Sequence, residues 1–516
     1  MIVDLVVVAA VAASLVVAGL TWFRVAQREH YVPGRVRVIA ALWRSRSRLD
    51  RALDAASVLL AFAAALAVLV PGAGRTVLTL LAVPAAVLGA VVPRGLSVRG
   101  RTSRLAWTGR LKRLLAAWAA AVVLLGAALW WALGVGGTAV LAVTVPLSAD
   151  LALAVMDRVE RRLSAPFVAK AQQRLARVRP TVVAVTGSYG KTSTKGYIAH
   201  VLAASRAVVS SPASFNNRLG LSRAVNDHLV DGTEVFVAEM GTFGPGEIRE
   251  LCALFPPDVA VITTIGEAHL ERMGSREVIA AAKGEITERA RIAVLPIDDP
   301  LLAGLAERCR AEGKRVVTVS TAGADADVVV DVEAGEARVA GVVLPLPEGV
   351  AHAVNLGVAL GVALALDVEP AGLAPRLKGS MPRAAHRAEV HAGAGLAVID
   401  DTYNANPIGA RAALDEAAAL AAERGGPLVV VTPGIVELGP VQTERNAAFA
   451  RAVAEAGARL VVVGRTNRAA LVAGAREAGL EPDVVATREQ AVPVATAAAG
   501  EEGVVLYEND LPDHYP

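Results

Sequence analysis

Residues 186–193, Thr-Gly-Ser-Tyr-Gly-Lys-Thr-Ser, place glycines, hydroxyls and one lysine directly after a β-branched run. Glycines let backbone N–H groups turn toward phosphate oxygens, and a helix start adds a positive dipole. In such a loop Lys191 reaches the terminal phosphates and Thr192 can ligate Mg²⁺, although Val185 occupies the first-glycine position of the general Walker pattern. We therefore predict a phosphate-binding loop made of Gly187, Ser188, Tyr189, Gly190, Lys191, Thr192 and Ser193.

The alternation of apolar and helical segments predicts the sheets that position this loop. Short β-branched runs begin at residues 181, 234, 258, 291 and 315 and alternate with Ala-rich stretches. This alternation is typical of a parallel sheet covered by helices. A second series begins near residue 388, with runs at 396, 427, 459 and 503. It predicts a separate, smaller α/β domain.

The first third of the 516-residue chain has a different composition. Hydrophobic residues make up 54% of the chain and mean hydropathy is +0.48, which is too apolar for an ordinary soluble enzyme. Five apolar runs have about the 20 residues that cross a membrane, at residues 2–23, 52–71, 76–93, 114–134 and 139–156. The last contains Pro146 and Asp150, so a re-entrant or interfacial segment is the alternative there.

The loops between these runs predict their orientation. Arginines fill the first loop, from Arg24 to Arg51, and the third, from Arg94 to Arg113, whereas the second has only Arg75. Loops rich in arginine and lysine usually remain on the cytoplasmic side of a membrane. We expect a multi-pass protein of the plasma membrane whose N-terminus lies outside and whose catalytic domains are cytoplasmic.

Residues 157–180 are rich in arginine among apolar side chains and predict a basic linker helix on the anionic leaflet, with membrane lipid as a partner. The net charge of +3 is too small to indicate binding to the phosphate backbone of a nucleic acid, so no nucleic acid is expected as a partner. Cys252 and Cys309 lack metal-ligand spacing and fit a reducing compartment.

The compact loop at 186–193 resembles the ATP signature of the Mur ligases, and further matches follow in order. Glu239 is similar to the family's metal-binding glutamate, and residues 244–248 resemble an element of its D-alanyl-D-alanine-adding branch. His269 occupies a second metal-ligand position, and Lys283 matches the lysine that the family carbamylates. The resemblance implies two Mg²⁺ ions, held by Thr192, Glu239, His269 and carbamylated Lys283.

More elements of the family lie downstream. Asn355 resembles the asparagine that reaches adenine, and Arg387 the arginine that contacts the γ-phosphate. Residues 400–407, Asp-Asp-Thr-Tyr-Asn-Ala-Asn-Pro, place Asp401 and Asn404 around the ribose and the domain junction. Residues 214–220 are similar to a segment near the carboxylate substrate. The resemblance implies that the catalytic residues are Lys191, His269, Lys283 and Arg387.

Hydropathy and charge predict a membrane region at 1–156 and the linker at 157–180. The resemblance implies a P-loop central domain at 181–387 and a Rossmann-like C-terminal domain at 388–516. It implies a ligase that phosphorylates a peptide carboxylate with ATP and transfers the acyl group to an amine, in peptidoglycan or related precursor synthesis. A membrane ligase of a poly-γ-glutamate-like polymer and an ATP-driven transporter or scaffold are the alternatives.

Two departures from the family bear on the substrate. Membrane segments take the place of the domain that holds the uridine nucleotide, so we expect the carboxylate to be presented at the membrane. The segments Thr432–Gly439 and Tyr507–Asp513 differ from the family's usual elements. The acidic residues of the second segment either attract an ammonium-bearing acceptor or form a solvated tail.

Overall fold

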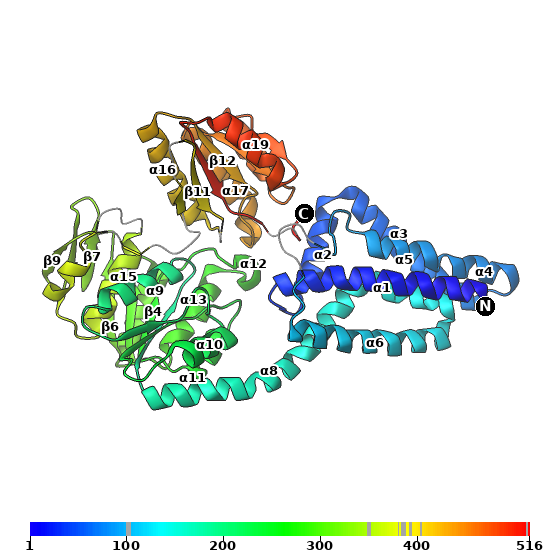
Figure 1. The fold of residues 1–516 in the computed structure, drawn as a ribbon, viewed down its shortest axis with the longest axis horizontal. Helices are drawn as coiled ribbons and strands as arrows, with labels where there is room; N and C mark the ends of the chain where they lie inside the picture. Colours follow the sequence, from blue (N-terminus) through cyan, green and yellow to red (C-terminus); the bar gives the residue numbers. More distant parts are fainter. Residues whose placement is uncertain are drawn as a thin grey trace. The chain divides into compact units, whose positions relative to one another are not determined.

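A computed structural model describes residues 1–99, 105–347, 352–379, 381–382, 389–391, 395–402, 405–511 and 514–516 (Figure 1). The chain divides into two compact units. Unit 1 contains Met1–Leu163 together with the short segments Gly464–Thr466 and Leu511–Pro516. Unit 2 contains Ser164–Val463 and Asn467–Asp510.

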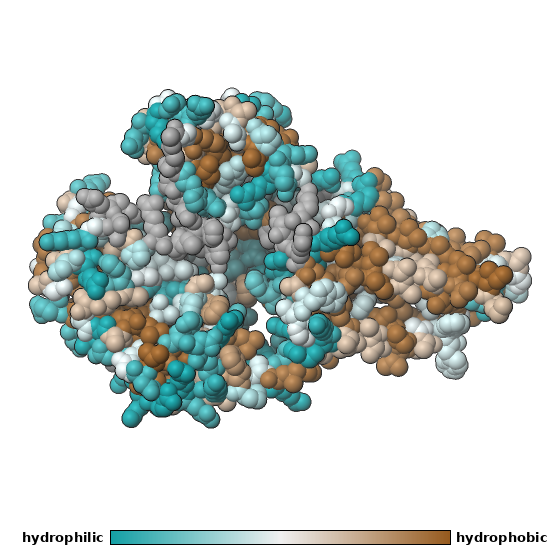
Figure 2. Space-filling model, viewed as in Figure 1, coloured by the Kyte–Doolittle hydropathy of each residue, from teal (hydrophilic) through white to brown (hydrophobic). Residues whose placement is uncertain are grey.

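Unit 1 is helical. Four helical stretches are long and apolar enough to cross a membrane, and a fifth candidate is bent by 72° between Val135–Val143 and Val145–Val178. Large apolar side chains point outward on them, as Figure 2 shows, including Leu59, 68% exposed, and Leu124, 73% exposed. Such a surface is costly in water and suits hydrocarbon. The helices are α1 (Ile2–Arg28), α2 (Arg35–Arg46), α3 (Arg48–Ala65), α4 (Gly72–Leu80), α5 (Ala82–Val91), α6 (Gly109–Leu133), α7 (Ala139–Val143) and α8 (Val145–Val178).

The fifth apolar run and the basic linker are one helix, since α8 continues without interruption from Val145 to Val178. Pro146 stands in its first turn, where a missing N–H costs no helical hydrogen bond. Buried Asp150 accepts hydrogen bonds from the backbone N–H groups of Gly34 and Arg37, both at 2.9 Å. Asp150 therefore caps the N-terminus of α2.

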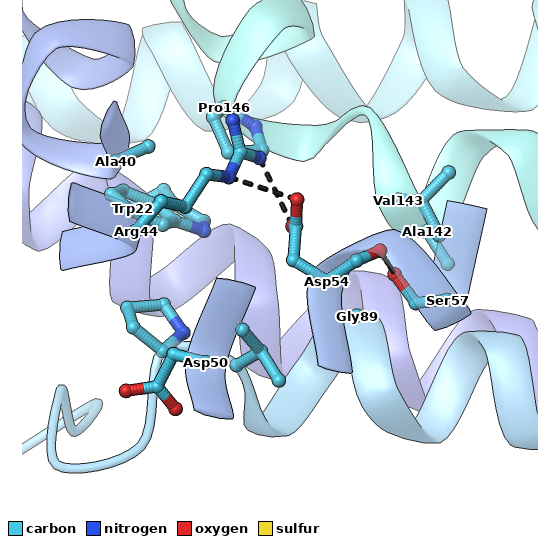
Figure 3. Close-up of a pocket in the computed structure, with 12 residues that line it drawn as sticks. Trp22, Ala40, Arg44, Asp50, Asp54, Ser57, Gly89, Ala142, Val143 and Pro146 are labelled. Carbon is cyan, nitrogen blue, oxygen red and sulfur yellow. Dashed lines mark hydrogen bonds and ion pairs between the residues drawn. The ribbon is translucent and has the colours of Figure 1, made fainter. Parts of the chain in front are cut away.

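A small cavity lies among the helices of unit 1 (Figure 3). Its volume is about 20 Å³, room for roughly one water molecule. The Arg44 guanidinium pairs with Asp54 at 2.9 Å on one side of it. Two charged residues that line the cavity, Arg44 and Asp54, thus form an ion pair inside the helical unit.

The larger sheet of unit 2 has nine strands in the order β2-β3-β1-β4-β5-β6-β7-β8-β9. The five predicted strands are confirmed and run parallel, and an antiparallel edge of β7 to β9 extends them. The strands are β1 (Thr181–Thr186), β2 (Val208–Ser210), β3 (Val235–Glu239), β4 (Val259–Ile262), β5 (Ile292–Pro296), β6 (Arg315–Ser320), β7 (Val328–Asp331), β8 (Glu336–Val339) and β9 (Val342–Pro345).

Helices cover both faces of this sheet. One face packs against α9 and α15 in a core of valines and leucines, and the other against α10, α11, α13 and α14. Their bounds are α9 (Lys191–Leu202), α10 (Arg218–His228), α11 (Glu247–Leu254), α12 (Leu270–Met273), α13 (Arg276–Gly284), α14 (Pro300–Ala311) and α15 (Ala353–Ala365).

The smaller sheet has six strands in the order β10-β11-β15-β12-β13-β14, all parallel except β10. The predicted second series of strands is confirmed. The elements are β10 (Glu389–His391), β11 (Ala397–Asp401), α16 (Pro407–Arg424), β12 (Leu428–Thr432), α17 (Gln442–Glu455), β13 (Arg459–Val463), α18 (Arg468–Glu477), β14 (Asp483–Val485), α19 (Arg488–Ala499) and β15 (Val504–Glu508).

Candidate active site

The loop at 187–190 joins β1 to α9 and has the backbone of a phosphate-binding loop. Gly187 and Gly190 have φ values of +153° and +77°. A Cβ on Gly187 would overlap Thr263, and one on Gly190 would overlap the Asn355 amide, so both positions require glycine. The Ser188 N–H donates to the Thr264 carbonyl at 2.9 Å. The loop is therefore fastened to the segment that follows β4.

The helix that starts at this loop presents its first turn of N–H groups to it, as anion binding requires. The Lys191 ammonium folds back and donates to the Gly187 carbonyl at 2.7 Å. This contact keeps the positive charge over the loop, within reach of a bound phosphate.

Glu239 ends β3 beside the loop, because the β1–β3 register pairs it with Val185. It is 1% exposed, and its carboxylate accepts three side-chain donors at 3.0 Å: the Thr192 hydroxyl, the Lys195 ammonium and the Asn216 amide. Lys195 was absent from the residues expected at the site. It lies four residues after Lys191 on the same face of α9, and that i,i+4 spacing was a signal for it.

Lys283 lies in the last turn of α13 and is 1% exposed. Its amine donates to the Gly187 carbonyl at 3.1 Å. No carboxylate of the described residues pairs with it. Burial, aided by the nearby Lys191 charge, holds the pKa of Lys283 well below its ordinary value. Burial and the Lys191 charge therefore favour the neutral form of this amine beside the phosphate loop.

His269 precedes α12 with a φ of +64° and contacts the C-terminal domain. Its Nδ1 lies 2.7 Å from the Glu437 carboxylate, which also pairs with Arg272. Burial lowers the pKa of His269, whereas its hydrogen bond and the Arg272 charge overcome burial and lower the pKa of Glu437 to about 2. Because a carboxylate only accepts, Nδ1 carries the proton and Nε2 keeps its lone pair.

A second contact joins the same segment to the C-terminal domain. The Arg445 guanidinium on α17 makes a bidentate pair with Glu267, with donor–acceptor distances of 2.8 and 2.6 Å. Glu267 also donates its backbone N–H to the Tyr189 hydroxyl at 2.8 Å. The phosphate loop and α17 thus hold opposite sides of the segment at 263–273.

Asn355 lies in the first turn of α15, 3% exposed, against Gly190. Asp401 ends β11 and is 7% exposed. Arg387 and Asn404 lie outside the described residues. The structure therefore brings Asn355 to the phosphate loop and places Asp401 at the carboxyl edge of the smaller sheet.

The donors at the loop fit a magnesium ion that is shared with a nucleotide. The described residues contain no group of three or more His, Cys, Asp or Glu side chains that could hold a metal by themselves. Magnesium, however, is usually held by one or two protein oxygens plus substrate phosphates. The Thr192 hydroxyl and the Glu239 carboxylate supply such a pair at the mouth of the loop.

Glu508 is an ionisable group buried at the carboxyl edge of the smaller sheet. It is 0% exposed, pairs in register with Asp401 and accepts from the Thr432 hydroxyl at 2.7 Å. Its other carboxylate oxygen has no hydrogen-bond partner among the described residues. Burial, with the charge of Asp401, raises the pKa of Glu508 to about 8. The carboxyl group is therefore protonated at neutral pH.

Replacing Glu508 by glutamine is expected to flatten the pH dependence of folding stability. Between its ordinary pKa of 4.5 and about 8, the unfolded chain has lost a proton that the folded chain keeps. Wild-type stability therefore falls as pH rises through this window, by about 2–5 kcal/mol in total. Glutamine avoids that loss and still accepts from Thr432. Melting temperatures from pH 5 to 9 would measure the difference, with exposed Glu502→Gln as the control, and parallel profiles of wild type and Glu508→Gln would contradict it.

Two family models match the chain: the Mur ligase middle domain over residues 185–358 and the Mur ligase glutamate ligase domain over residues 386–507. The UDP-N-acetylmuramoyl-tripeptide–D-alanyl-D-alanine ligase of Mycobacterium leprae is 35% identical over 47% of this chain and 51% of its own length. The ligase of that name from Bacillus subtilis is 32% identical over 51% of this chain and 57% of its own. The chain thus spans about half the length of these curated relatives.

Solved structures agree with the sequence matches. MurF from Acinetobacter baumannii is 26% identical, with a TM-score of 0.54 over 66% of this chain and 76% of its own. MurF from Thermotoga maritima in complex with ADP is 26% identical, with a TM-score of 0.53 over 67% and 79% of the two chains. Because the two family models together cover the ligase part from the phosphate loop to the last strand, the chain belongs to the Mur ligase family.

Proposed function

We propose that this chain is an ATP-dependent ligase that joins a peptide carboxylate to an amine through an acyl phosphate, in peptidoglycan or related cell-envelope precursor synthesis. The observation that carries the proposal is the convergence of Thr192 and Lys195 on Glu239 beside the phosphate loop. The relatives' name, a D-alanyl-D-alanine ligase, supports the reaction type.

The nucleotide would lie along the loop at 187–193. The N–H groups at the start of α9 bind phosphate oxygens, and Lys191 turns from the Gly187 carbonyl to the γ-phosphoryl group. By resemblance to the family, Asn355 would reach adenine, Asp401 and Asn404 would contact the ribose, and Arg387 would stabilise the transferring charge. Thr192 and Glu239 would hold the shared Mg²⁺, whose charge would neutralise the triphosphate and the incoming carboxylate.

Two steps complete the reaction. A carboxylate oxygen attacks the γ-phosphorus and ADP leaves, which gives the acyl phosphate. The amine then attacks the acyl carbon, loses a proton and expels inorganic phosphate, which gives the amide.

Lys283 would act as a carbamate. The neutral form of its amine attacks CO₂, an N–C bond forms and a proton leaves to solvent. The amine, which has no oxygen atoms, thereby gains a carboxylate-like group whose oxygens can bind a metal. With His269 Nε2, whose ring is held by Glu437, that carbamate would supply the second Mg²⁺ site.

The apolar helices would make this a multi-pass membrane protein with cytoplasmic ligase domains, with borders at residues 156, 180 and 387. Because these apolar helices directly precede the ligase domains, we propose that the carboxylate arrives on a lipid carrier or a growing polymer. The test is product detection by mass spectrometry, with the purified protein in nanodiscs and the same peptide presented on either a lipid or UDP. Efficient ligation only of the lipid-linked peptide is expected, whereas equal ligation of the UDP-linked peptide would overturn membrane presentation.

A further inference from the structure

Lys195 is a buried lysine beside the phosphate loop that takes no part in either step of the proposed reaction. It lies in the second turn of α9 and is 4% exposed. Its ammonium donates to the Glu239 carboxylate at 3.0 Å and to the Ala213 carbonyl at 2.5 Å. Because an ammonium is costly to bury without acceptors, these two contacts are what hold Lys195 in this place.

The Glu239 carboxylate is surrounded by donors that fix its direction. Its Oε1 accepts from the Asn216 amide, and its Oε2 accepts from both the Thr192 hydroxyl and the Lys195 ammonium, each at 3.0 Å. The backbone N–H of Glu239 donates to the Ser211 hydroxyl at 3.1 Å. One carboxylate oxygen is therefore shared by a hydroxyl and a cation at the mouth of the loop.

The buried charge of Glu239 requires a cation. Glu239 is 1% exposed, and its ion-pair partner among the described residues is Lys195. Asn216 and Thr192 are neutral donors, so they do not compensate the charge. A buried carboxylate that loses its charged partner strongly destabilises the folded state. The Lys195 ammonium therefore supplies a compensating charge that a bound metal ion would also supply.

The ammonium and a divalent ion would use the same carboxylate oxygen. Thr192 and Glu239 are the pair of side chains that fits Mg²⁺, and their contact is made at Glu239 Oε2. Magnesium binds its oxygen ligands at about 2.0–2.1 Å. An ion on this oxygen and the Lys195 ammonium carry like charges, which repel strongly in a buried site. The two cations therefore compete for Glu239.

The second acceptor of Lys195 allows this exchange within the site. Ala213 has a φ of +40°, a left-handed conformation that is strained for alanine, and Lys195 bonds its carbonyl. Ala213 lies three residues before Asn216, whose amide holds the other oxygen of Glu239. An ammonium that leaves Glu239 keeps the Ala213 carbonyl, so a metal ion can replace it without expelling the side chain from the site.

We propose that Lys195 is a positioning residue that competes with the divalent ion for Glu239. It holds the carboxylate in place and compensates its charge in the metal-free protein, and it weakens the binding of a metal ion that arrives alone. Nucleotide phosphates add further oxygen ligands, so the site is filled by the metal–nucleotide complex rather than by the metal. This inference rests on the proposed function, because it takes Glu239 as a metal ligand.

Binding of Mn²⁺ alone to the full chain in nanodiscs tests this role, read as loss of the free-ion signal in electron paramagnetic resonance. Lys195→Met should bind Mn²⁺ at least about 10-fold more tightly than wild type, because a like charge is removed from a buried site. Lys195→Arg keeps the charge and should stay within about threefold of wild type. The control is Lys314→Met, whose lysine also contacts one carbonyl and one carboxylate, those of Thr287 and Glu312, but whose carboxylate is exposed.

Folding stability gives a second readout. Lys195→Met leaves Glu239 uncompensated, so its melting temperature without metal should fall by about 5 °C or more, and Mn²⁺ should restore it. The double variant Lys195→Met, Glu239→Gln has a neutral pair and should melt near wild type with no gain from Mn²⁺.

The proposal is overturned if Lys195→Met binds Mn²⁺ no more tightly than wild type, or if Mn²⁺ fails to rescue a Lys195→Met protein that unfolds without it. Neither readout requires ATP turnover or an amine. Tighter Mn²⁺ binding by Lys195→Met, together with phosphate release that is indifferent to both substrates, would support the role of Lys195 and overturn the ligase.

Discussion

Lys191→Ala is expected to lose nucleotide binding and to lower ATP turnover by at least about 100-fold, the scale seen when one preorganised charge-stabilising donor is removed. The Lys191 ammonium donates to the Gly187 carbonyl at 2.7 Å and stands over the loop whose N–H groups face the phosphates. Without it, the γ-phosphoryl oxygens lose a charge-assisted donor in both the bound and the transition state.

The substitution should leave the fold intact, because alanine suits the first turn of α9 and the Lys191 hydrogen bonds to the Gly187 and Ser188 carbonyls are local. Binding of a fluorescent ATP analogue would measure the effect. Lys170→Ala, at an exposed position of α8, is the matched control. An unchanged melting temperature with unchanged nucleotide affinity would show that Lys191 is not a phosphate ligand.

Lys283→Ala is expected to lower the rate of ligation by about 1,000-fold, and high bicarbonate should not restore that rate. The pKa of the buried amine beside Gly187 is lowered, which favours the neutral form that can react with CO₂ to give a carbamate, whereas alanine has no amine. The loss combines one metal ligand with one charge at the site of phosphoryl transfer.

A spectroscopic measurement separates this role from simple packing. ¹³C-bicarbonate should give one carbamate resonance in wild type that is absent from Lys283→Ala and retained in Lys314→Ala, whose amine bonds the Thr287 carbonyl away from the loop. An active Lys283→Ala protein, or the same resonance in that variant, would contradict the assignment of a carbamate to Lys283.

Local patterns made much of the fold predictable. The β-branched runs gave every strand that borders the phosphate loop, because strands buried on both faces are continuous apolar stretches. The strands β7 to β9 at one end of the larger sheet, each with one buried face, were not predicted. They are four residues each, and their pairing depends on neighbours rather than on a local apolar run.

The site was predictable only where chemistry follows a motif. Glu239 was expected from its resemblance to the family's metal-binding glutamate. Lys195 belongs to no motif, and its spacing from Lys191 does not show that the β1–β3 register brings it to Glu239. The pairing of His269 with Glu437 joins residues that are 168 positions apart. Contacts of that kind depend on how two domains pack, which spacing along the chain does not encode.

The apolar N-terminal region shows the same division. Hydropathy located the long helices, because a helix able to cross a bilayer needs one apolar run of about 20 residues. The joining of the fifth run to the basic linker in a single α8 was not apparent, since the composition changes within the helix and Pro166 lies inside it, although the helix continues from Val145 to Val178.

The central claim, that ATP is used to couple a carboxylate to an amine, is tested most directly by phosphate release from the full chain in nanodiscs. Phosphate would be measured with ATP alone, with a lipid-linked peptide carboxylate, with D-alanyl-D-alanine as amine, and with both together. The account predicts little phosphate unless both substrates are present, with one ligated product formed for each phosphate released. Rapid phosphate release that is indifferent to both substrates would contradict it and would favour an ATP-driven transporter or scaffold.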